Sequence, residues 1–240
     1  MPNIKFYPFS HATMDFAQPP QPASKFTPSW YKRQPGTIND EETLPKGFST
    51  VTVKKCMPVF DLMTAGYIIT APCDIHLDAT DPNTLSFTVP LPMKQFQADM
   101  FASHGPEQYS EYPMDKEKDH PMLLRILPFW SVKTDPGYSC LFMQPAHADF
   151  SPLTALQALV DTDKFISEGH LSFIVKKGFK GVIKQGTPLV QVVPFKREEW
   201  SSSIVDPDNS KQQITSQRLD LRSTFANGYK TKFRSKKEYK

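Results

Sequence analysis

The chain contains 240 residues, of which 39% are hydrophobic and 22% are charged. This composition predicts a folded globular protein and excludes a chain that is disordered throughout. No apolar run approaches the roughly 20 residues that cross a bilayer, and residues 1 to 6 lack the apolar stretch of a signal peptide. We therefore expect a protein that is neither secreted nor transmembrane, makes no membrane contact and lies by default in the cytoplasm.

Proline and cysteine usage narrow the fold class. The chain holds 23 prolines against 10 glycines. Proline stops helices and interrupts strand pairing, so we predict a mainly β fold of short strands with few short helices. The three cysteines, Cys56, Cys73 and Cys140, lie far apart and never in a CxxC spacing, so we expect buried free thiols rather than disulfides or a zinc site.

Residues 1 to 48 are rich in proline and also carry many aromatic side chains. Such a segment cannot form long regular elements, yet it holds too many aromatic residues for an idle linker. We interpret it as an extended N-terminal arm with Trp30 and Tyr31 as predicted binding residues. Two placements stay open: the arm wraps its own domain, or it reaches a neighbouring subunit.

Residues 49 to 200 carry the patterns of a β core domain. Turns at 81–83 and 135–137 are each predicted to close a hairpin between the strands beside them. Residues 94 to 121 have a weaker pattern and are interpreted as a long excursion from the sheet. Strands are expected at 49–55, 66–71, 74–79, 85–89, 123–127, 130–134, 138–144 and within 159–195, with short helical segments at 58–63 and 152–159.

Residues 201 to 240 are predicted to form a polar helix over 211–225, with Asp208 or Ser210 as its N-cap, and then a basic tail. The last twelve residues hold six Lys or Arg and one Glu, a net charge of +5, which leaves −2 for the rest of the chain. Cations beside aromatic residues favour weak, salt-sensitive contact with nucleic acid. A solvated terminus is the alternative. The predicted binding residues of the tail are Lys230, Lys232, Arg234, Lys236 and Lys237.

Asp161 and Asp163 are the candidate catalytic residues. They lie two apart at the start of a predicted strand, so both carboxylates are expected on one face. Paired carboxylates act as a base or hold Mg²⁺, but they also serve as turn residues that accept hydrogen bonds from local backbone N–H groups, and both readings stay open.

Neither the histidines nor the common catalytic motifs predict a metal or catalytic site in this sequence. His147, Asp149 and His170 contain the residue types of a facial iron triad, but their spacing does not favour one, so no metal site is predicted. The six histidines are interpreted as surface or loop residues. The sequence has no phosphate-binding glycine loop, GxSxG, HExxH or CxxC motif. It therefore leaves the question of enzymatic activity open and favours a protein that is not an enzyme.

Residues 159 to 195 resemble part of the dUTPase and dCTP deaminase family. The resemblance rests on Val160-Asp161-Thr162-Asp163-Lys164-Phe165 and on Ile183-Lys184-Gln185-Gly186-Thr187-Pro188-Leu189-Val190-Gln191-Val192. It implies a single β-barrel or jelly-roll, β-clip-like domain, and it places Asp161 where the family activates its water. The family's phosphate-binding serine and glycine-rich C-terminal arm have no clear equivalent here, and no cofactor is expected unless Mg²⁺ serves such an enzyme.

A second resemblance covers about three quarters of the chain. Pro28-Ser29-Trp30-Tyr31-Lys32, Lys54 to Asp61, Thr64 to Ile69, Val160 to Asp163 and Gly186 to Gln191 follow the order of an uncharacterised protein family of tailed bacteriophages. It implies a viral setting, in the virion or the host cytoplasm. We accordingly expect a non-enzymatic virion or assembly component that contacts other phage proteins or itself, with a dUTPase-like nucleotide-binding or nucleotide-hydrolysing enzyme as the alternative.

Overall fold

The computed structural model describes residues 1–39, 50–149, 151–166, 170–222 and 227–240. Sixteen strands in five sheets and a few short helices make up these residues, which confirms the predicted β-rich fold. Every pairing between these strands is antiparallel. The described sheets stay open, and none of them closes into a barrel.

The largest sheet has β16 (Pro188–Lys196) at its centre, and β16 comes largely from the stretch 159–195, within which strands are predicted. All four residues of β5 are buried, as its run of apolar and β-branched side chains requires. A turn at Gly186, with φ of 81°, precedes β16. The strands of this sheet, in spatial order, are β13 (Ala158–Val160), β11 (Tyr138–Met143), β16 (Pro188–Lys196), β5 (Tyr67–Thr70) and β2 (Gln21–Pro22).

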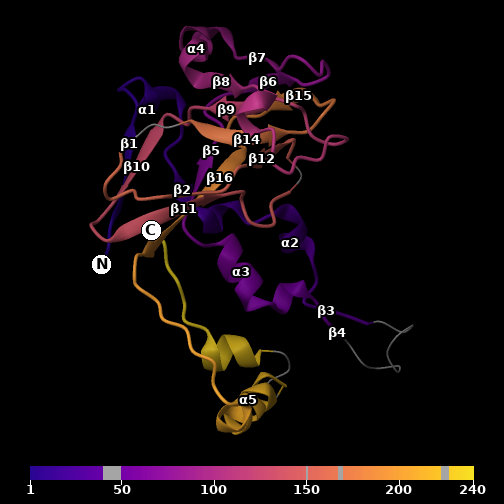
Figure 1. The fold of residues 1–240 in the computed structure, drawn as a ribbon, viewed down its shortest axis with the longest axis vertical. Helices are drawn as coiled ribbons and strands as arrows, with labels where there is room; N and C mark the ends of the chain where they lie inside the picture. The colour runs from indigo at the N-terminus through magenta and orange to yellow at the C-terminus, as the bar shows by residue number, and fades with distance from the viewer. Residues whose placement is uncertain (40–49, 150, 167–169, 223–226) are drawn as a thin grey trace.

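Two further sheets lie above this one in the view of Figure 1 and share one hydrophobic core with it. Fully buried side chains of that core include Ile75, Leu124 and Phe173. The predicted turn at 81–83 joins β6 to β7 as a hairpin. One of them has four strands, in the spatial order β12 (Leu153–Ala155), β14 (Leu171–Val175), β9 (Leu123–Ile126) and β8 (Phe101–His104). The other has three, in the order β15 (Lys180–Ile183), β6 (Ile75–Asp78) and β7 (Ser86–Thr88).

The described part of the N-terminal arm packs on its own domain. β1 (Ile4–Pro8) pairs with β10 (Trp130–Thr134), and β2 forms the edge of the largest sheet. The arm therefore follows the first of its two predicted placements within this chain. Its other elements are α1 (Thr13–Phe16), η1 (Ala23–Phe26), α2 (Ser29–Arg33) and β3 (Thr37–Ile38), which pairs with β4 (Thr50–Val51).

The helices of the core are short, as its proline content predicts. η2 (Val53–Lys55) replaces the last three residues of the predicted strand 49–55, because the Thr52 side chain accepts a hydrogen bond from the backbone N–H of Lys54 and starts a 3-10 turn; only β4 within this stretch forms a strand. Residue 49 lies outside the described residues. α3 (Met57–Met63) agrees with the helical segment predicted at 58–63. The excursion contains η3 (Leu91–Phe96), α4 (Gln97–Met100), β8 and η4 (Pro106–Tyr109).

The predicted hairpin at 130–144 is wrong. The turn at 135–137 is present, with Tyr138 N–H donating to Asp135 O at 3.3 Å, but the two strands beside it belong to different sheets. β10 pairs with β1, while β13 and β16 occupy both edges of β11. Long-range partners therefore replace the local pairing that the turn favours.

The helix predicted at 152–159 is also wrong. This segment forms β12 and β13, and β12 pairs with β14. Leu153 and Ala155 are buried while Thr154 between them is exposed, the period of two that defines a strand. The amide oxygen of Gln144 accepts a hydrogen bond from the Ala155 N–H at 2.6 Å, so a side chain also binds the backbone of β12.

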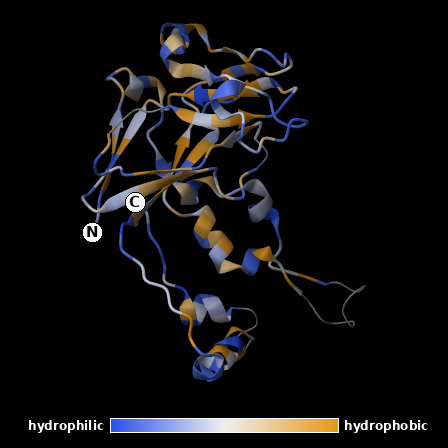
Figure 2. Cartoon of the chain, viewed as in Figure 1, coloured by the Kyte–Doolittle hydropathy of each residue, from blue (hydrophilic) through white to orange (hydrophobic). Residues whose placement is uncertain are grey.

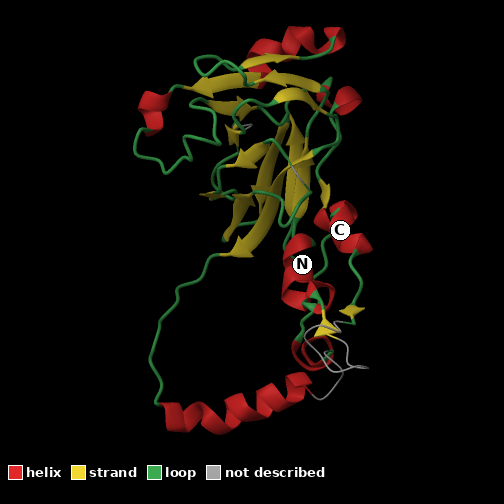
Figure 3. Cartoon of the chain, turned by 90° about the vertical axis from the view of Figure 1, so that its right-hand side faces the viewer, coloured by secondary structure: helices red, strands yellow, loops and turns green. Residues whose placement is uncertain are grey.

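The C-terminal segment leaves the core and returns to it. After β16 the chain runs in an extended conformation to α5 (Pro207–Arg222), well away from the sheets, and comes back through η5 (Tyr229–Phe233) (Figures 1 and 3). Asp206, rather than the predicted Asp208 or Ser210, accepts the first backbone N–H of this helix, from Asp208 at 2.9 Å. The predicted helix end at 223–225 lies outside the described residues. No helix among the described residues has the length and apolar content to cross a membrane.

A buried amide connects three parts of the core. Gln191, in β16, is 0% exposed. Its Oε1 accepts the Ala146 N–H at 2.9 Å, and its Nε2 donates to Leu62 O at 2.8 Å and to Ala65 O at 2.7 Å. At the start of β5, Gly66 has φ of 68°, and a Cβ there would lie 2.0 Å from Val192 O. The end of α3 is thereby held directly against β16.

We predict that Gln191→Leu, which keeps the side-chain volume, lowers the free energy of unfolding by about 3 kcal/mol, because it removes three hydrogen bonds between a fully buried side chain and the backbone. Gln212→Leu, at an exposed position of α5, serves as the control and is expected to change it by less than about 0.5 kcal/mol. Urea denaturation measures both. Equal stabilities of the two variants would contradict a connecting role of Gln191.

Candidate functional site

Asp161 and Asp163 lie in a turn, not in the strand predicted for them. The backbone N–H groups of Lys164 and Phe165 both donate to Asp161 O at 2.9 Å, directly after β13. The expectation of a strand is wrong because this local turn satisfies the backbone. The two carboxylates nevertheless meet, since both contact Arg197, the residue that follows β16.

Arg197 closes a network around the two carboxylates. Its Nη1 donates to Asp163 Oδ1 at 2.8 Å and to Asp161 Oδ1 at 3.3 Å, and its Nη2 donates to Asp163 Oδ2. Ser139 Oγ donates to Asp161 Oδ1 at 2.6 Å, and the Gly137 N–H donates to Asp163 Oδ2 at 2.8 Å. Arg197 could not be identified from the sequence, because 34 residues separate it from Asp163 and no motif marks it.

This network makes Asp163 an unsuitable base. The hydrogen bonds from Arg197 hold its pKa far below the ordinary range of an aspartate, and its side chain is only 6% exposed. The carboxylate is therefore ionised at neutral pH and already neutralised by a bidentate guanidinium. The two residues lie in a turn, but the groups named above that donate to their carboxylates belong to Gly137, Ser139 and Arg197, which are distant in the sequence.

A cavity of about 420 Å³ lies beside this network. Val160 and Thr162 line it, but neither Asp161 nor Asp163 does. Most of its lining is aliphatic or aromatic, and His170 is the one titratable side chain among its described lining residues. Without Lys or Arg in its wall, the cavity offers no partner for the charge of a triphosphate.

The predicted binding residues of the arm, Trp30 and Tyr31, form contacts within the chain. Ser29 donates to Asp149 through its N–H and its Oγ, both at 2.9 Å, and Trp30 Nε1 donates to His147 O at 2.7 Å. Tyr31 is 4% exposed, and its hydroxyl donates to Lys54 O at 3.1 Å. Trp30 and Tyr31 thus fasten the arm to the core.

The histidines form no metal centre. Asp149 bonds Ser29, and His170 bonds Asp99 O at 3.0 Å. Within the part of the chain that the structure describes, no three His, Cys, Asp or Glu side chains are grouped as metal ligands. His120 lies in a loop, as one of the two predicted placements has it, and is fully buried: its Nδ1 accepts the Met122 N–H at 3.0 Å and its Nε2 lies 2.8 Å from Asp81 O.

Cations of the tail pair with carboxylates of the same chain. Arg234 donates through Nε and Nη2 to Asp61 Oδ1 at 2.9 and 2.7 Å, and Lys237 lies 3.3 Å from Asp61 Oδ2. These contacts lower the pKa of Asp61, with the Arg234 hydrogen bond as the largest cause. Lys232 pairs with Asp220 and Lys236 with Glu238. Four of the five predicted binding residues in the tail therefore have partners within the chain.

The two chain ends meet at a basic pocket of about 380 Å³. This pocket brings together Tyr31 from the arm and Lys230 and Arg234 from the tail, all predicted as binding residues. The remaining lining residues, which the sequence analysis did not single out, are Thr27, Lys32, Lys54, Met57 and Phe60.

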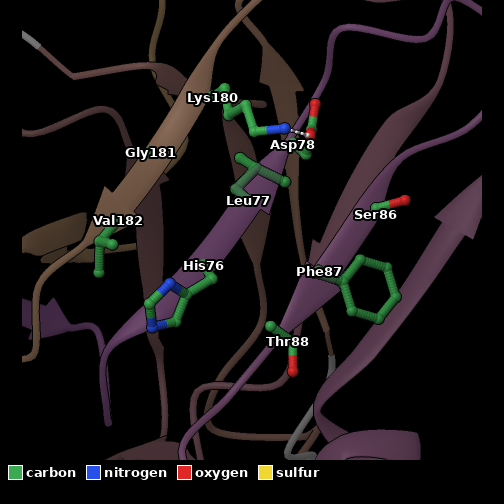
Figure 4. Close-up of a pocket in the computed structure, with 9 residues that line it drawn as sticks. All are labelled: His76, Leu77, Asp78, Ser86, Phe87, Thr88, Lys180, Gly181 and Val182. Carbon is green, nitrogen blue, oxygen red and sulfur yellow. Dashed lines mark ion pairs between the residues drawn. The ribbon is translucent and has the colours of Figure 1, made fainter.

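Another hollow, of about 340 Å³, lies over the three-stranded sheet β15–β6–β7 (Figure 4). Cross-strand register places His76 between Val182 and Thr88, and Asp78 between Lys180 and Ser86. Lys180 Nζ lies 2.7 Å from Asp78 Oδ2; the Lys180 side chain is well exposed and the Asp78 side chain is partly buried. This ion pair satisfies both charges, so the hollow offers no free pair of groups for catalysis.

Comparisons of the chain with protein-family models, with curated proteins and with solved structures found no match. The β-clip and bacteriophage resemblances therefore rest on the residues quoted for them.

We predict that Arg197→Met lowers the urea midpoint at neutral pH, because Asp163 loses its cation. A depressed aspartate pKa contributes stability above the unfolded value of about 3.9, and this contribution is lost as pH falls through the folded value. The deficit of the variant should therefore shrink below about pH 4.

Lys196→Met is the control, since Lys196 and Glu198 form an exposed pair that is expected to contribute little. Urea denaturation at about pH 7 and about pH 3 makes the comparison. A deficit of Arg197→Met that is the same at both pH values would contradict the assigned role of the ion pair.

Proposed function

We propose that this protein is a non-enzymatic component of a bacteriophage particle or of its assembly, and that it acts through protein–protein contacts. The observation that carries the proposal is the exposed segment formed by residues 197–222. Three large apolar side chains stand in solvent on its extended part: Trp200 is 88% exposed, Ile204 104% and Val205 59%.

The exposed segment has the chemistry of a contact surface. Large aromatic side chains are enriched at protein interfaces, and exposed apolar groups gain free energy when a partner covers them. α5 adds Ile214 and Leu221, which are seven residues apart and therefore lie on one side of the helix. Figure 2 shows hydrophobic positions interspersed among hydrophilic ones along this segment.

The geometry of the exposed segment supports a role in assembly. The segment is fixed at one end by β16 and at the other by the tail, which pairs with Asp61. It is thus held at a defined place away from the sheets (Figure 3). A segment fixed at both ends loses less conformational entropy on binding than a free terminus does.

The viral setting is supported by the resemblance of the quoted segments, including Pro28 to Lys32 and Gly186 to Gln191, to a tailed-bacteriophage family. The partners under this proposal are other phage proteins or further copies of this chain, in the virion or the host cytoplasm. We also propose a jelly-roll or β-clip-like relationship for the core, supported by the strand–glycine–strand order of β15, Gly186 and β16.

The alternative of a dUTPase-like enzyme gains no support from the geometry. Asp161 and Asp163 are engaged by Arg197, and the described residues that line the neighbouring cavity include no Lys or Arg. Neither a free carboxylate pair for Mg²⁺ nor a cradle for phosphates is formed there.

We predict that Trp200→Ser combined with Ile204→Ser abolishes association without unfolding the protein, because both side chains are exposed. Leu91→Ser is the matched control, since Leu91 is 86% exposed and lies in η3, outside the exposed segment. Mass spectrometry of purified particles measures incorporation, and sedimentation velocity measures self-association. We expect the wild-type chain and the control in particles and the double variant to be lost from them. Absence of the wild-type chain from particles, or equal incorporation of all three proteins, would overturn the proposal.

A further inference from the structure

The basic pocket gathers four cationic side chains around one volume. Lys32 comes from α2, Lys54 from η2, and Lys230 and Arg234 from the C-terminal tail. Segments that are distant in the sequence thus supply like charges to one place. Like charges repel one another, so such a grouping favours an anionic ligand.

Aromatic contacts hold two of these cations in place. Lys54 Nζ lies 4.3 Å from the centre of the Tyr31 ring, and the Arg234 guanidinium carbon lies 5.7 Å from that of Phe60. The Tyr31 and Phe60 rings stack on each other with centroids 5.9 Å apart. Cation–π and stacking contacts therefore fix the positions of these pocket side chains in the absence of a ligand.

The charge of the pocket is only partly neutralised. Arg234 pairs with Asp61, and Lys237 shares the same carboxylate. No ion pair joins Lys32, Lys54 or Lys230 to a carboxylate among the residues that the structure describes. The side chains of Lys32 and Lys230 are exposed and free to turn toward a ligand.

We propose that the basic pocket binds a nucleotide unit through its phosphate. Three lysines without carboxylate partners complement a phosphate, and the apolar side chains of Met57 and Phe60 offer a surface for the sugar or the base. A volume of about 380 Å³ lies within the range of small-molecule sites. The unit belongs either to a single strand of nucleic acid or to a free nucleotide, which share this chemistry.

This site differs from a free basic tail. Lys232, Lys236 and Lys237 pair with carboxylates of the chain, so the tail does not act as an unstructured polycation. The tail contributes to the basic pocket by placing Lys230 and Arg234 opposite the arm. Binding of this kind adds contact with nucleic acid or nucleotides to the proposed assembly role, and neither role requires the other.

The test uses the full chain and a fluorescent oligothymidylate of about 20 nucleotides, with anisotropy measured between about 50 and 200 mM salt. The variant Lys32→Glu with Lys230→Glu changes two exposed pocket lysines. The control Lys116→Glu with Lys164→Glu makes the same change of charge at two exposed lysines that do not line the pocket. Unlabelled thymidine monophosphate as competitor separates a free nucleotide from a strand.

We expect the pocket variant to bind at least about tenfold more weakly than the control at the lower salt, with a salt dependence of log K that is smaller by about 0.7 for each lost phosphate contact. Displacement by the mononucleotide assigns the site to free nucleotides, and its failure assigns it to strands; both support phosphate recognition. Absence of binding by the wild-type chain, or equal affinity of the two variants, would overturn the proposal.

Discussion

The ion pair between Asp61 and Arg234 is the contact on which both surfaces of the proposals depend, the exposed segment and the basic pocket. It joins α3 of the core to the end of the chain, and both side chains are largely buried. Around it, Lys237 reaches the same carboxylate, Tyr239 packs edge-on against Tyr67, and the Tyr67 hydroxyl donates to Lys240 O at 3.1 Å. Because the tail is held here, residues 197–222 form a closed excursion and the basic pocket acquires its second wall.

The same arrangement separates the two proposed activities in space. The exposed segment presents Trp200 and Ile204 on an extended chain beyond β16, whereas the basic pocket lies between α2, α3 and η5. Loss of apolar side chains from the exposed segment leaves the pocket lysines unchanged, and the reverse also holds. The proposed protein contacts and the proposed nucleotide binding are therefore expected to be separable by substitution, as independent sites are when they share no side chain.

The local patterns of the core were predictable from the sequence, and its long-range partners were not. Alternation and β-branching correctly indicated β5, β6, β9 and β16, because those strands bury the residues that the pattern selects. The hairpin at 135–137 failed, since the pairing of β10 with β1 and of β11 with β13 and β16 is decided by segments far away in the chain. The residues of β12 and β13 lacked a local signal strong enough to exclude a helix.

In the candidate sites, too, the local pattern was predictable from the sequence and the long-range partner was not. Asp161 and Asp163 stood out as a pair, but their role depends on Arg197, and the sequence carries no sign of that contact. The tail was recognised as basic from its composition. Its docking could not be predicted, because Arg234 and Asp61 are separated by 173 residues and a single carboxylate in α3 gives no pattern. Lys54 was missed for a similar reason: its position over Tyr31 exists only in the folded chain.

Hydrogen exchange of the tail tests the docking most directly. The Thr231 and Arg234 N–H groups donate to Asn227 O and Tyr229 O within η5, so their exchange reports whether this element is held on the core. We expect both amides to exchange slowly in the wild-type chain and rapidly in Asp61→Asn, while the amides of β16 stay protected in both. Equal exchange of the η5 amides in the two proteins would contradict the account, because the tail would then not depend on Asp61.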